Sequence, residues 1–260
     1  KEGHVIKYRL PRNIIARMQS LEYDRSFLAA RILLDKINAN MIISGAFGLF
    51  EKKTVIAVGG YDNSTMGEDM ELVVRLHEFS RMNRKPYKID FAQDAICWSQ
   101  TPEKLSELGK QRKRWQRGLF QCMWGHRKML ANPRYGAVGL LSYIYFLFYE
   151  LLSPFIELFG ILTMVLSVMM DMLNVKFMLV FLACYALYGI LLTLTAYFSR
   201  IYTIDQRLSF RELSLAITAC FFETTFLRFY LAFVRVTAFV GYKKNKLNWG
   251  KLERKKMNGI

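Results

Sequence analysis

The sequence is poor in the residues that build metal centres and disulfide frameworks. Its 260 residues include only four cysteines and three histidines. No two cysteines form a Cys-x-x-Cys pair, and the histidines do not cluster, so neither a zinc site nor a disulfide framework is predicted. We expect the cysteines to behave as small buried hydrophobic residues in a reducing compartment. The residues concerned are Cys97, Cys122, Cys184, Cys220, His4, His77 and His126.

Acidic residues are scarce as well. The chain has 37 Lys and Arg against 21 Asp and Glu, a net charge of +16. Nucleic-acid binding would explain the charge, but no such motif is visible, and it would not explain a hydrophobic content of 53% and a mean hydropathy of +0.13. Long apolar runs with excess basic residues instead predict an integral membrane protein with a basic cytoplasmic surface. No secretory signal follows Lys1.

Two adjacent carboxylates, Glu68 and Asp69, stand at the predicted start of a helix. They follow a turn-like stretch, residues 59–64, and precede residues 70–77, whose apolar side chains recur at helical spacing. The helix dipole favours negative charge at this end. On these residues alone, a helix cap and a functional pair of acids are both open interpretations.

A second cluster, Gln111, Arg114 and Trp115, has the spacing i, i+3 and i+4 and therefore forms one patch on a helix. An amide, a guanidinium and an indole together offer hydrogen bonds to hydroxyls, charge for a phosphate and a flat apolar face for a sugar ring. The alternative is an interfacial helix whose aromatic and basic residues touch lipid headgroups.

Taken together, the two clusters resemble a known family. A Glu-Asp pair followed by Gln-x-x-Arg-Trp is similar to the acceptor half of processive-type family 2 glycosyltransferases, membrane enzymes that include hyaluronan, cellulose and poly-N-acetylglucosamine synthases. The resemblance extends over essentially the whole chain. It includes the segment that the family places under the acceptor sugar, which marks Gly45, Ala46 and Phe47 as substrate-binding residues. Further matching segments are 59–61, 98–102 and 248–255.

The resemblance implies an α/β fold, the second half of a GT-A-like nucleotide-sugar transferase domain, followed by interfacial and transmembrane α-helices. The expected divisions are residues 1–102 (acceptor side of the catalytic domain), 103–135 (interface helix with the Gln-x-x-Arg-Trp motif), 136–241 (transmembrane region) and 242–260 (basic cytoplasmic tail).

Local patterns predict the elements of the first half. Residues 8–40 have apolar side chains near a 3.6-residue period and should form an amphipathic helix after Pro11. Residues 41–50 and 87–98 read as strands, and residues 103–130 as a helix in the membrane interface.

The second half contains three apolar stretches. Residues 140–170 exceed the roughly 20 residues of one span and should kink at Pro154. Glu150 and Glu157 should point away from lipid, either lining a polar path for a glycan or lipid or making a helix–helix contact. Residues 177–198 form a clear span, whereas 213–240 contain charges and are predicted to form a re-entrant or interfacial helical hairpin.

The resemblance also implies a mechanism. Asp69 would be the general base that deprotonates an acceptor hydroxyl as it attacks a nucleotide-activated sugar with inversion, and Glu68 would orient or tune it. Gln111 and Arg114 would bind the departing diphosphate or the acceptor, and Trp115 would stack on the acceptor sugar. The implied partners are a nucleotide-sugar donor, a glycan or lipid acceptor, membrane lipids and other subunits of a synthesis or export complex. The catalytic part would be cytoplasmic, on a multi-pass protein of the cell membrane.

One departure from the family is large. No Asp-x-Asp, the motif that holds the divalent metal and the sugar-nucleotide diphosphate, occurs in the sequence. We therefore expect the chain to be the C-terminal portion of a longer enzyme or a truncated product, with the Mg²⁺ or Mn²⁺ ligands mainly in a missing N-terminal half. Two alternatives are a non-catalytic or partner-completed scaffold subunit of a polysaccharide synthesis system and a transporter built around charges such as Glu223 and Arg228.

Overall fold

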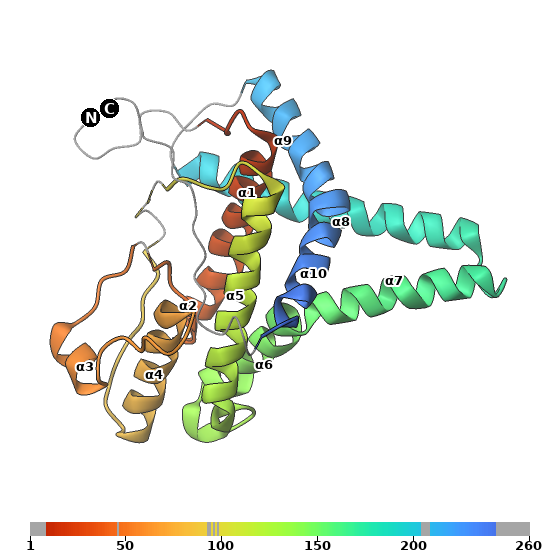
Figure 1. Cartoon of the computed structure of the whole chain (residues 1–260). Coiled ribbons are helices and arrows are strands. Elements are labelled where there is room, and N and C mark those ends of the chain that lie inside the picture. Colours follow the sequence, from red (N-terminus) through yellow and green to blue (C-terminus); the bar gives the residue numbers. More distant parts are fainter. Residues whose placement is uncertain are drawn as a thin grey trace.

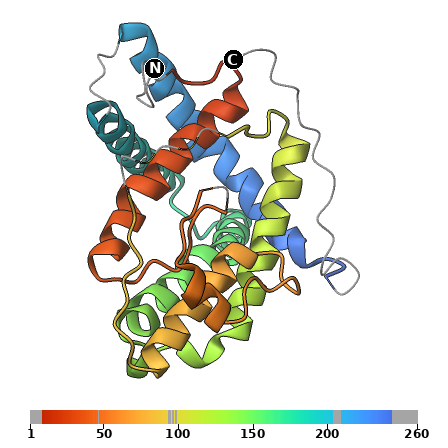
Figure 2. The same cartoon turned by 90° about the vertical axis from the view of Figure 1, so that its left-hand side faces the viewer.

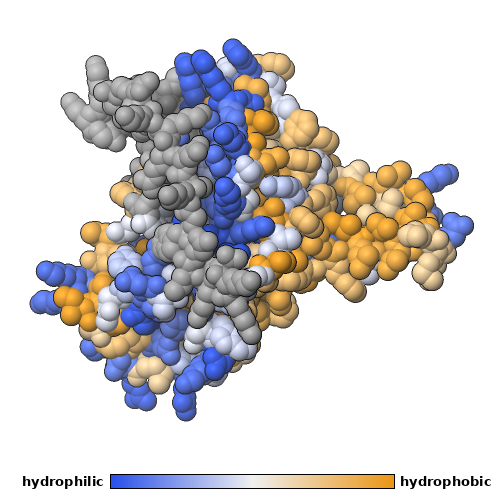
Figure 3. Space-filling model, in the orientation of Figure 1, coloured by the Kyte–Doolittle hydropathy of each residue, from blue (hydrophilic) through white to orange (hydrophobic). Residues whose placement is uncertain are grey.

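The computed structural model describes residues 9–45, 47–92, 95, 97, 99–203 and 209–242. The chain forms a helical body from which two helices project together as an arm (Figure 1). The view turned by 90° looks along this arm and shows the body helices crossing in front of it (Figure 2). The arm surface is almost entirely apolar, whereas polar side chains gather on the body (Figure 3).

The predicted N-terminal amphipathic helix is present. It consists of α1 (Ile14–Arg25), a π-helical stretch η1 (Ser26–Arg31) and α2 (Ile32–Lys36). Asn13 caps its start, because the Asn13 side-chain oxygen accepts hydrogen bonds from the amides of Ile15 and Ala16 at 2.8 and 3.1 Å. Its first part, α1, packs against two later apolar helices, which span residues 175–203 and 210–222. The N-terminal helix therefore connects the body to these apolar helices.

The two strands predicted at residues 41–50 and 87–98 are not formed among the described residues. Residues 41–45, 47–50 and 87–92 belong to no strand in the described part of the chain, and the Phe47 amide instead closes a turn by donating to the Ser44 carbonyl at 3.0 Å. A strand needs a neighbouring backbone to pair with. In the second segment the amides of Ile89 and Phe91 instead donate to the side-chain oxygens of Asn38 and Asp35, at 2.9 and 2.8 Å. The α/β GT-A-like architecture is therefore not seen, and the described chain is helical.

Two helices follow these segments. After the short α3 (Lys52–Ala57), α4 (Glu68–Met82) buries a face that includes Met70 and Val74 against α5 (Leu105–Gly125). The helix predicted at residues 103–130 exists as α5, followed by the 3-10 turns η2 (Arg127–Met129) and η3 (Pro133–Tyr135); its place in the membrane interface stays a prediction. A core cluster beneath these elements holds the two helices together.

The first apolar stretch is bent where proline predicts it. The first part comprises η4 (Val138–Ser142), α6 (Tyr143–Tyr145) and η5 (Phe146–Leu151); the second is α7 (Ser153–Met169). The two parts meet at 46°, with Pro154 in the first turn of α7. The missing amide and the ring of proline break the helix there, so the predicted kink is confirmed.

The remaining apolar stretches are two long helices. α8 (Val175–Thr203) follows α7 and returns from the tip of the arm toward the body (Figure 1). α9 (Phe210–Phe222), η6 (Glu223–Leu227), α10 (Arg228–Val236) and η7 (Thr237–Phe239) follow as one continuous helical path across the body. The predicted hairpin at 213–240 is therefore wrong. No glycine or proline interrupts residues 210–239, and a π-helical turn absorbs the one irregularity.

Two helices, α8 and the stretch from Phe210 to Phe239, are long and apolar enough to cross a membrane, and a bent pair could supply a third span. The charges within the apolar stretches make ion pairs. Glu157 accepts from Arg228 at 2.6 Å, and Glu223 accepts twice from Arg25, at 2.8 and 2.9 Å. Arg235 lies 3.6 Å from a Glu150 carboxylate oxygen. These contacts match the helix–helix interpretation of the charges.

The cysteines divide into two groups. Cys122 and Cys220 are buried as expected, whereas Cys97 and Cys184 are exposed. Cys184 lies on α8, in the arm, where the side chains face outward rather than into a protein core. The expectation of burial is therefore wrong for Cys97 and Cys184.

Candidate active site

The acidic pair lies in the first turn of α4, but it does not cap the helix. The N-cap position is Gly67, which makes no side-chain hydrogen bond. Both carboxylates are half-buried, and Asp69 accepts a hydrogen bond from the Met70 amide at 2.8 Å. Their charge is favoured by the positive end of the helix dipole. The capping interpretation is therefore not supported by the geometry.

Gly45 lies directly against Asp69. A Cβ atom added to Gly45 would be 2.8 Å from Asp69 Oδ2, closer than any real Cβ contact. A side chain at this position would force the Asp69 carboxylate to turn away, so glycine allows the backbone to lie against it. The structure therefore brings together two of the predicted site residues that are 24 positions apart in the sequence. Phe47 is 55% exposed beside them, and Ala46 lies outside the described residues.

The loop before the acidic pair is fixed to α5 by two residues. Gly118 packs backbone to backbone on Gly67, because a Cβ atom on Gly118 would lie 2.8 Å from the Gly67 nitrogen. The Gln121 side-chain oxygen accepts from the Met66 amide at 2.8 Å. The start of α4 is thus held on one stripe of α5.

The predicted amide and guanidinium lie on the same stripe. Gln111 and Arg114 precede Gly118 by seven and four positions, and residues at these spacings share a helix face. The Gln111 side-chain oxygen is buried without a hydrogen-bond partner among the described residues. Arg114 is half-buried and has an interaction partner. The face of α5 that carries the acidic loop therefore also carries these two side chains.

Trp115 lies at the edge of this stripe. It is 40% exposed, its ring centroid is 6.4 Å from that of Tyr23, and the Arg112 guanidinium lies 4.6 Å from its ring. Arg112 in turn pairs with Glu22 at 2.6 Å. An indole that is held by neighbours but half open to solvent can stack on a planar or sugar-like ligand.

Sequence reasoning missed a cation beside the acid. Arg31, in η1, interacts electrostatically with the carboxylates of Asp69 and Glu150. Its Nε is buried without a hydrogen-bond partner among the described residues. Burial lowers the pKa of Arg31 to about 10, and the two carboxylates oppose this shift. Arg31 therefore stays charged at neutral pH. Nothing in its spacing distinguishes it from other basic residues of the predicted helix.

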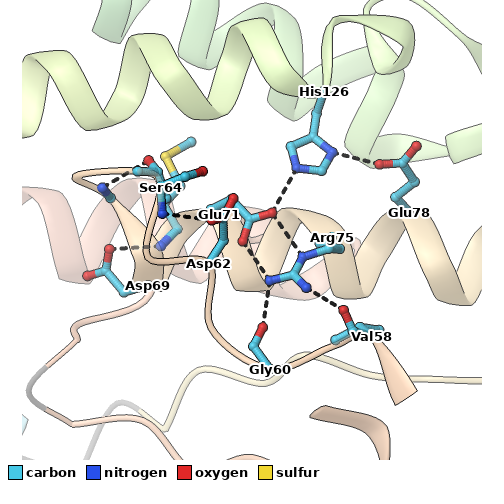
Figure 4. Close-up of polar contacts among 12 residues, drawn as sticks. Val58, Gly60, Asp62, Ser64, Asp69, Glu71, Arg75, Glu78 and His126 are labelled. Carbon is cyan, nitrogen blue, oxygen red and sulfur yellow. Dashed lines mark hydrogen bonds and ion pairs between the residues drawn. The ribbon is translucent and has the colours of Figure 1, made fainter. Parts of the chain in front are cut away.

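A polar network fixes the remainder of α4 (Figure 4). Glu71 accepts two hydrogen bonds from Arg75, at 2.9 and 2.7 Å, and Arg75 also donates to the carbonyls of Val58 and Gly60. Gly59 and Gly60 have φ of +90° and +75°, which only glycine adopts without strain. Arg75 thereby holds the turn that leads into the acidic loop.

His126, at the end of α5, closes the network. Its Nδ1 lies 2.6 Å from Glu78 and its Nε2 3.4 Å from Glu71. Burial opposes a charge on His126, but the hydrogen bonds and charges of Glu71 and Glu78 outweigh it and raise the pKa of His126. The pKa of Glu71 shifts the opposite way. Burial alone would raise it, but hydrogen bonds from His126 and Arg75 outweigh burial and lower it.

The described residues do not by themselves fit a divalent metal. Within them, no group of three or more His, Cys, Asp or Glu side chains is placed to hold an ion. No catalytic step below runs through a metal.

A family model described as glycosyl transferase family group 2 matches residues 3–239 of this chain. The chain therefore belongs to that glycosyltransferase family. Curated relatives include the poly-beta-1,6-N-acetyl-D-glucosamine synthases of Staphylococcus aureus (strain COL) and Staphylococcus epidermidis, 32% and 31% identical over 120 residues. Each alignment covers 46% of this chain and 26% of the relative, so the chain spans about a quarter of the length of the relatives it matches. No solved structure matches the chain significantly.

Proposed function

We propose that this chain supplies the acceptor side and the membrane region of a glycosyltransferase that moves a sugar from a nucleotide-sugar donor to a glycan or lipid acceptor, with inversion. The observation that carries the proposal is the docking of the acidic loop on α5. Gly118 and Gln121 hold Met66 and Gly67 on the same helix face that carries the amide and guanidinium. Two clusters that are separate in sequence thereby border one surface.

In this proposal Asp69 is the general base. It would remove the proton from the acceptor hydroxyl as that oxygen attacks the anomeric carbon, and the nucleoside diphosphate would leave from the opposite face. Glu68 would orient or tune Asp69. Gly45, Ala46 and Phe47 would lie under the acceptor sugar, and a side chain at Gly45 would crowd the Asp69 carboxylate.

Gln111 and Arg114 would bind the departing diphosphate or the acceptor, and Trp115 would stack on the acceptor sugar. The Gln111 side-chain oxygen is buried without a partner among the described residues, and because an amide oxygen only accepts hydrogen bonds it suits a donating hydroxyl of the acceptor rather than a phosphate. The names of the relatives suggest poly-N-acetylglucosamine as the class of product. A divalent metal, held mainly by residues outside this chain, a multi-pass topology with a cytoplasmic site and further subunits belong to the same proposal.

The experiment is the substitution Asp69→Asn in the complete enzyme. Removing a general base is expected to lower transfer by roughly 100- to 10,000-fold, while binding of the donor stays nearly unchanged. Asp90→Asn is the matched control, because Asp90 is an exposed carboxylate paired only with Lys88. Transfer by Asp69→Asn at the rate of the control would contradict the assignment.

A further inference from the structure

A second polar site lies at the opposite end of α4 from the acidic pair. A cavity of about 780 Å³ opens there between the end of α4, the segment 84–87 and η3. Its lining includes Arg81, Arg84, Lys85 and Arg134. Thirteen residues separate Met82 from Asp69 along α4, a distance of about 20 Å at 1.5 Å per residue. The cavity is therefore separate from the proposed active site.

The cavity is strongly basic. Four cations line it, from α4, the segment after it and η3, and no acidic side chain does among the described residues. No ion pair joins Arg81, Arg84, Lys85 or Arg134 to a carboxylate within that part of the chain. Like charges that converge on a concave surface repel each other and attract a counter-ion.

A chain of hydrogen bonds through Tyr87 and His77 holds the guanidinium of Arg81 in place. Arg81 Nε donates to the Tyr87 hydroxyl at 3.1 Å, and that hydroxyl lies 2.7 Å from His77 Nδ1. His77 Nε2 donates to the Asn40 carbonyl at 2.8 Å. Burial, together with the Arg81 charge, lowers the pKa of His77 to about 4, so His77 is neutral and its Nδ1 accepts the Tyr87 proton. A chain of hydrogen bonds thus anchors Arg81 in the core.

One face of Arg81 is also covered. A Cβ atom on Gly136 would lie 3.1 to 3.3 Å from the guanidinium, and Gly136 has a φ of +61°. The terminal amino groups of Arg81 make no hydrogen bond to another described residue. A fixed, planar guanidinium with both of these groups unused matches the oxygens of a phosphate.

Capping of α4 does not account for these cations. Basic side chains near a helix C-terminus can complement the dipole by donating to the last carbonyls. Here the amides of Asn83, Arg84 and Lys85 and the side chain of Asn83 already bond those carbonyls. None of the four cations that line the cavity does so, and Arg134 comes from a different element.

We propose that the cavity lined by Arg81, Arg84, Lys85 and Arg134 binds a phosphate-bearing ligand, with Arg81 as its fixed anchor. A soluble molecule and a lipid headgroup present the same phosphate chemistry to these cations, and the test below distinguishes the two sources. This site does not depend on the activity proposed above.

The test uses the full chain in detergent micelles and two probes. Inorganic pyrophosphate is titrated by calorimetry, and short-chain phosphatidylglycerol added to the micelles is counted as bound adducts by native mass spectrometry, with phosphatidylcholine as the neutral comparison. The site variant is Arg84→Ala/Arg134→Ala, which leaves the hydrogen-bond chain of Arg81 intact. The matched control is Lys52→Ala/Lys53→Ala, which removes the same charge from exposed positions on α3. The titration is repeated with Arg114→Ala to exclude binding at the α5 motif.

We expect the site variant to weaken pyrophosphate binding at least roughly tenfold, since each charge-assisted hydrogen bond contributes about that factor. The Lys52→Ala/Lys53→Ala control should change it less than about twofold, and the loss in the site variant should persist when Arg114→Ala removes any pyrophosphate bound at the α5 motif. If only the phosphatidylglycerol adducts fall in the site variant, the ligand is a lipid headgroup. Absence of saturable binding in both arms, or equal losses in the site variant and the control, would overturn the proposal.

Discussion

Two stretches of similar length and apolar character have different surroundings. α8 has 29 residues and the stretch Phe210–Phe239 has 30, and both are apolar enough to cross a membrane. Yet 6% of the most apolar window of α8 is buried inside the protein, compared with 44% for the second stretch. The mean hydropathies of these windows are 2.3 and 1.4. Length and hydropathy therefore identify both helices as candidates, but only packing separates them.

The positions of charged residues explain the difference. Between Lys176 and Arg200 α8 carries no charged side chain, and its one ion pair among the described residues, Arg200 with Asp24 of α1 at 3.0 Å, lies near its C-terminal end. The second stretch carries charges that are paired with other elements: Glu223 with Arg25 of α1, and Arg235 with Gln116 of α5 at 2.7 Å. Each of these charges needs a partner within the protein, because an unpaired charge in lipid is costly. Charges thus mark the helix that belongs to the body.

Of the substitutions considered, one that removes the Arg25–Glu223 ion pair should lower the stability most. Arg25 donates two hydrogen bonds to Glu223, whose side chain is 6% exposed, and a third to Thr193 of α8 at 2.6 Å. Arg25→Ala leaves Glu223 buried without its partner and should lower the free energy of unfolding by about 3–5 kcal/mol. The measurement is an SDS titration of the protein in mild detergent.

Lys88→Ala is the control for this experiment. Lys88 pairs with Asp90 where both side chains are more than 60% exposed, and we expect no measurable change. If Arg25→Ala were as stable as Lys88→Ala, the second stretch would not be anchored to the body through Glu223.

A matched pair of glycines tests packing in the two regions. Gly118 lies in the body, where an added Cβ would be 2.8 Å from a backbone nitrogen; Gly160 lies on α7 in the arm, where nothing is within 4 Å. Gly118→Ala should therefore cost about 1–3 kcal/mol in unfolding free energy. Gly160→Ala should leave it unchanged or raise it by up to about 1 kcal/mol, because alanine favours a helix.

The same pair of variants also tests the proposed function. If the Gly67–Gly118 contact positions the acidic loop, Gly118→Ala should lower transfer by up to roughly 100-fold in the complete enzyme, and Gly160→Ala should not. Both substitutions add one methyl group to a helix. Equal activity of the two variants would mean that the Gly67–Gly118 contact does not contribute to catalysis.

Local patterns predicted much of this architecture. The amphipathic helix after Pro11, the acidic start of α4, the helix α5 and the kink at Pro154 all follow from periodicity and from the chemistry of single residues. These features are set by interactions within a few turns of chain. The strands failed for the opposite reason, because a strand depends on a distant partner, and the side chains of Asp35 and Asn38 bond the segment instead.

The site residues that were missed depend on long-range contacts. Gly118 and Gln121 continue the spacing of Gln111 and Arg114 along one helix face, so that spacing was a signal that could have found them. Arg31 gave no such signal, since its proximity to the acidic pair arises only when η1 folds back toward α4.

The smallest expected effect is a pH dependence in the network of His126. The pKa of His126 is higher in the folded protein than its ordinary value of about 6.5. The stability that this shift contributes is therefore fully present below about pH 6.5 and is lost as the pH rises through the folded-state value. His126→Gln should lower the free energy of unfolding by about 1 kcal/mol near pH 6, the usual net contribution of one hydrogen bond, and by less near pH 9.

The pKa of Glu71 gives the opposite trend at lower pH. Because it is lowered by folding, its contribution is lost as the pH falls below the ordinary range of a glutamate. The difference between wild type and His126→Gln should therefore be greatest between these limits and shrink on both sides. Unfolding titrations at pH 4, 6 and 9 measure it, and Lys88→Ala serves as the control because Lys88 is exposed and pairs with Asp90 rather than with this network. A constant difference at all three pH values would mean that His126 acts through packing alone and not through its charge.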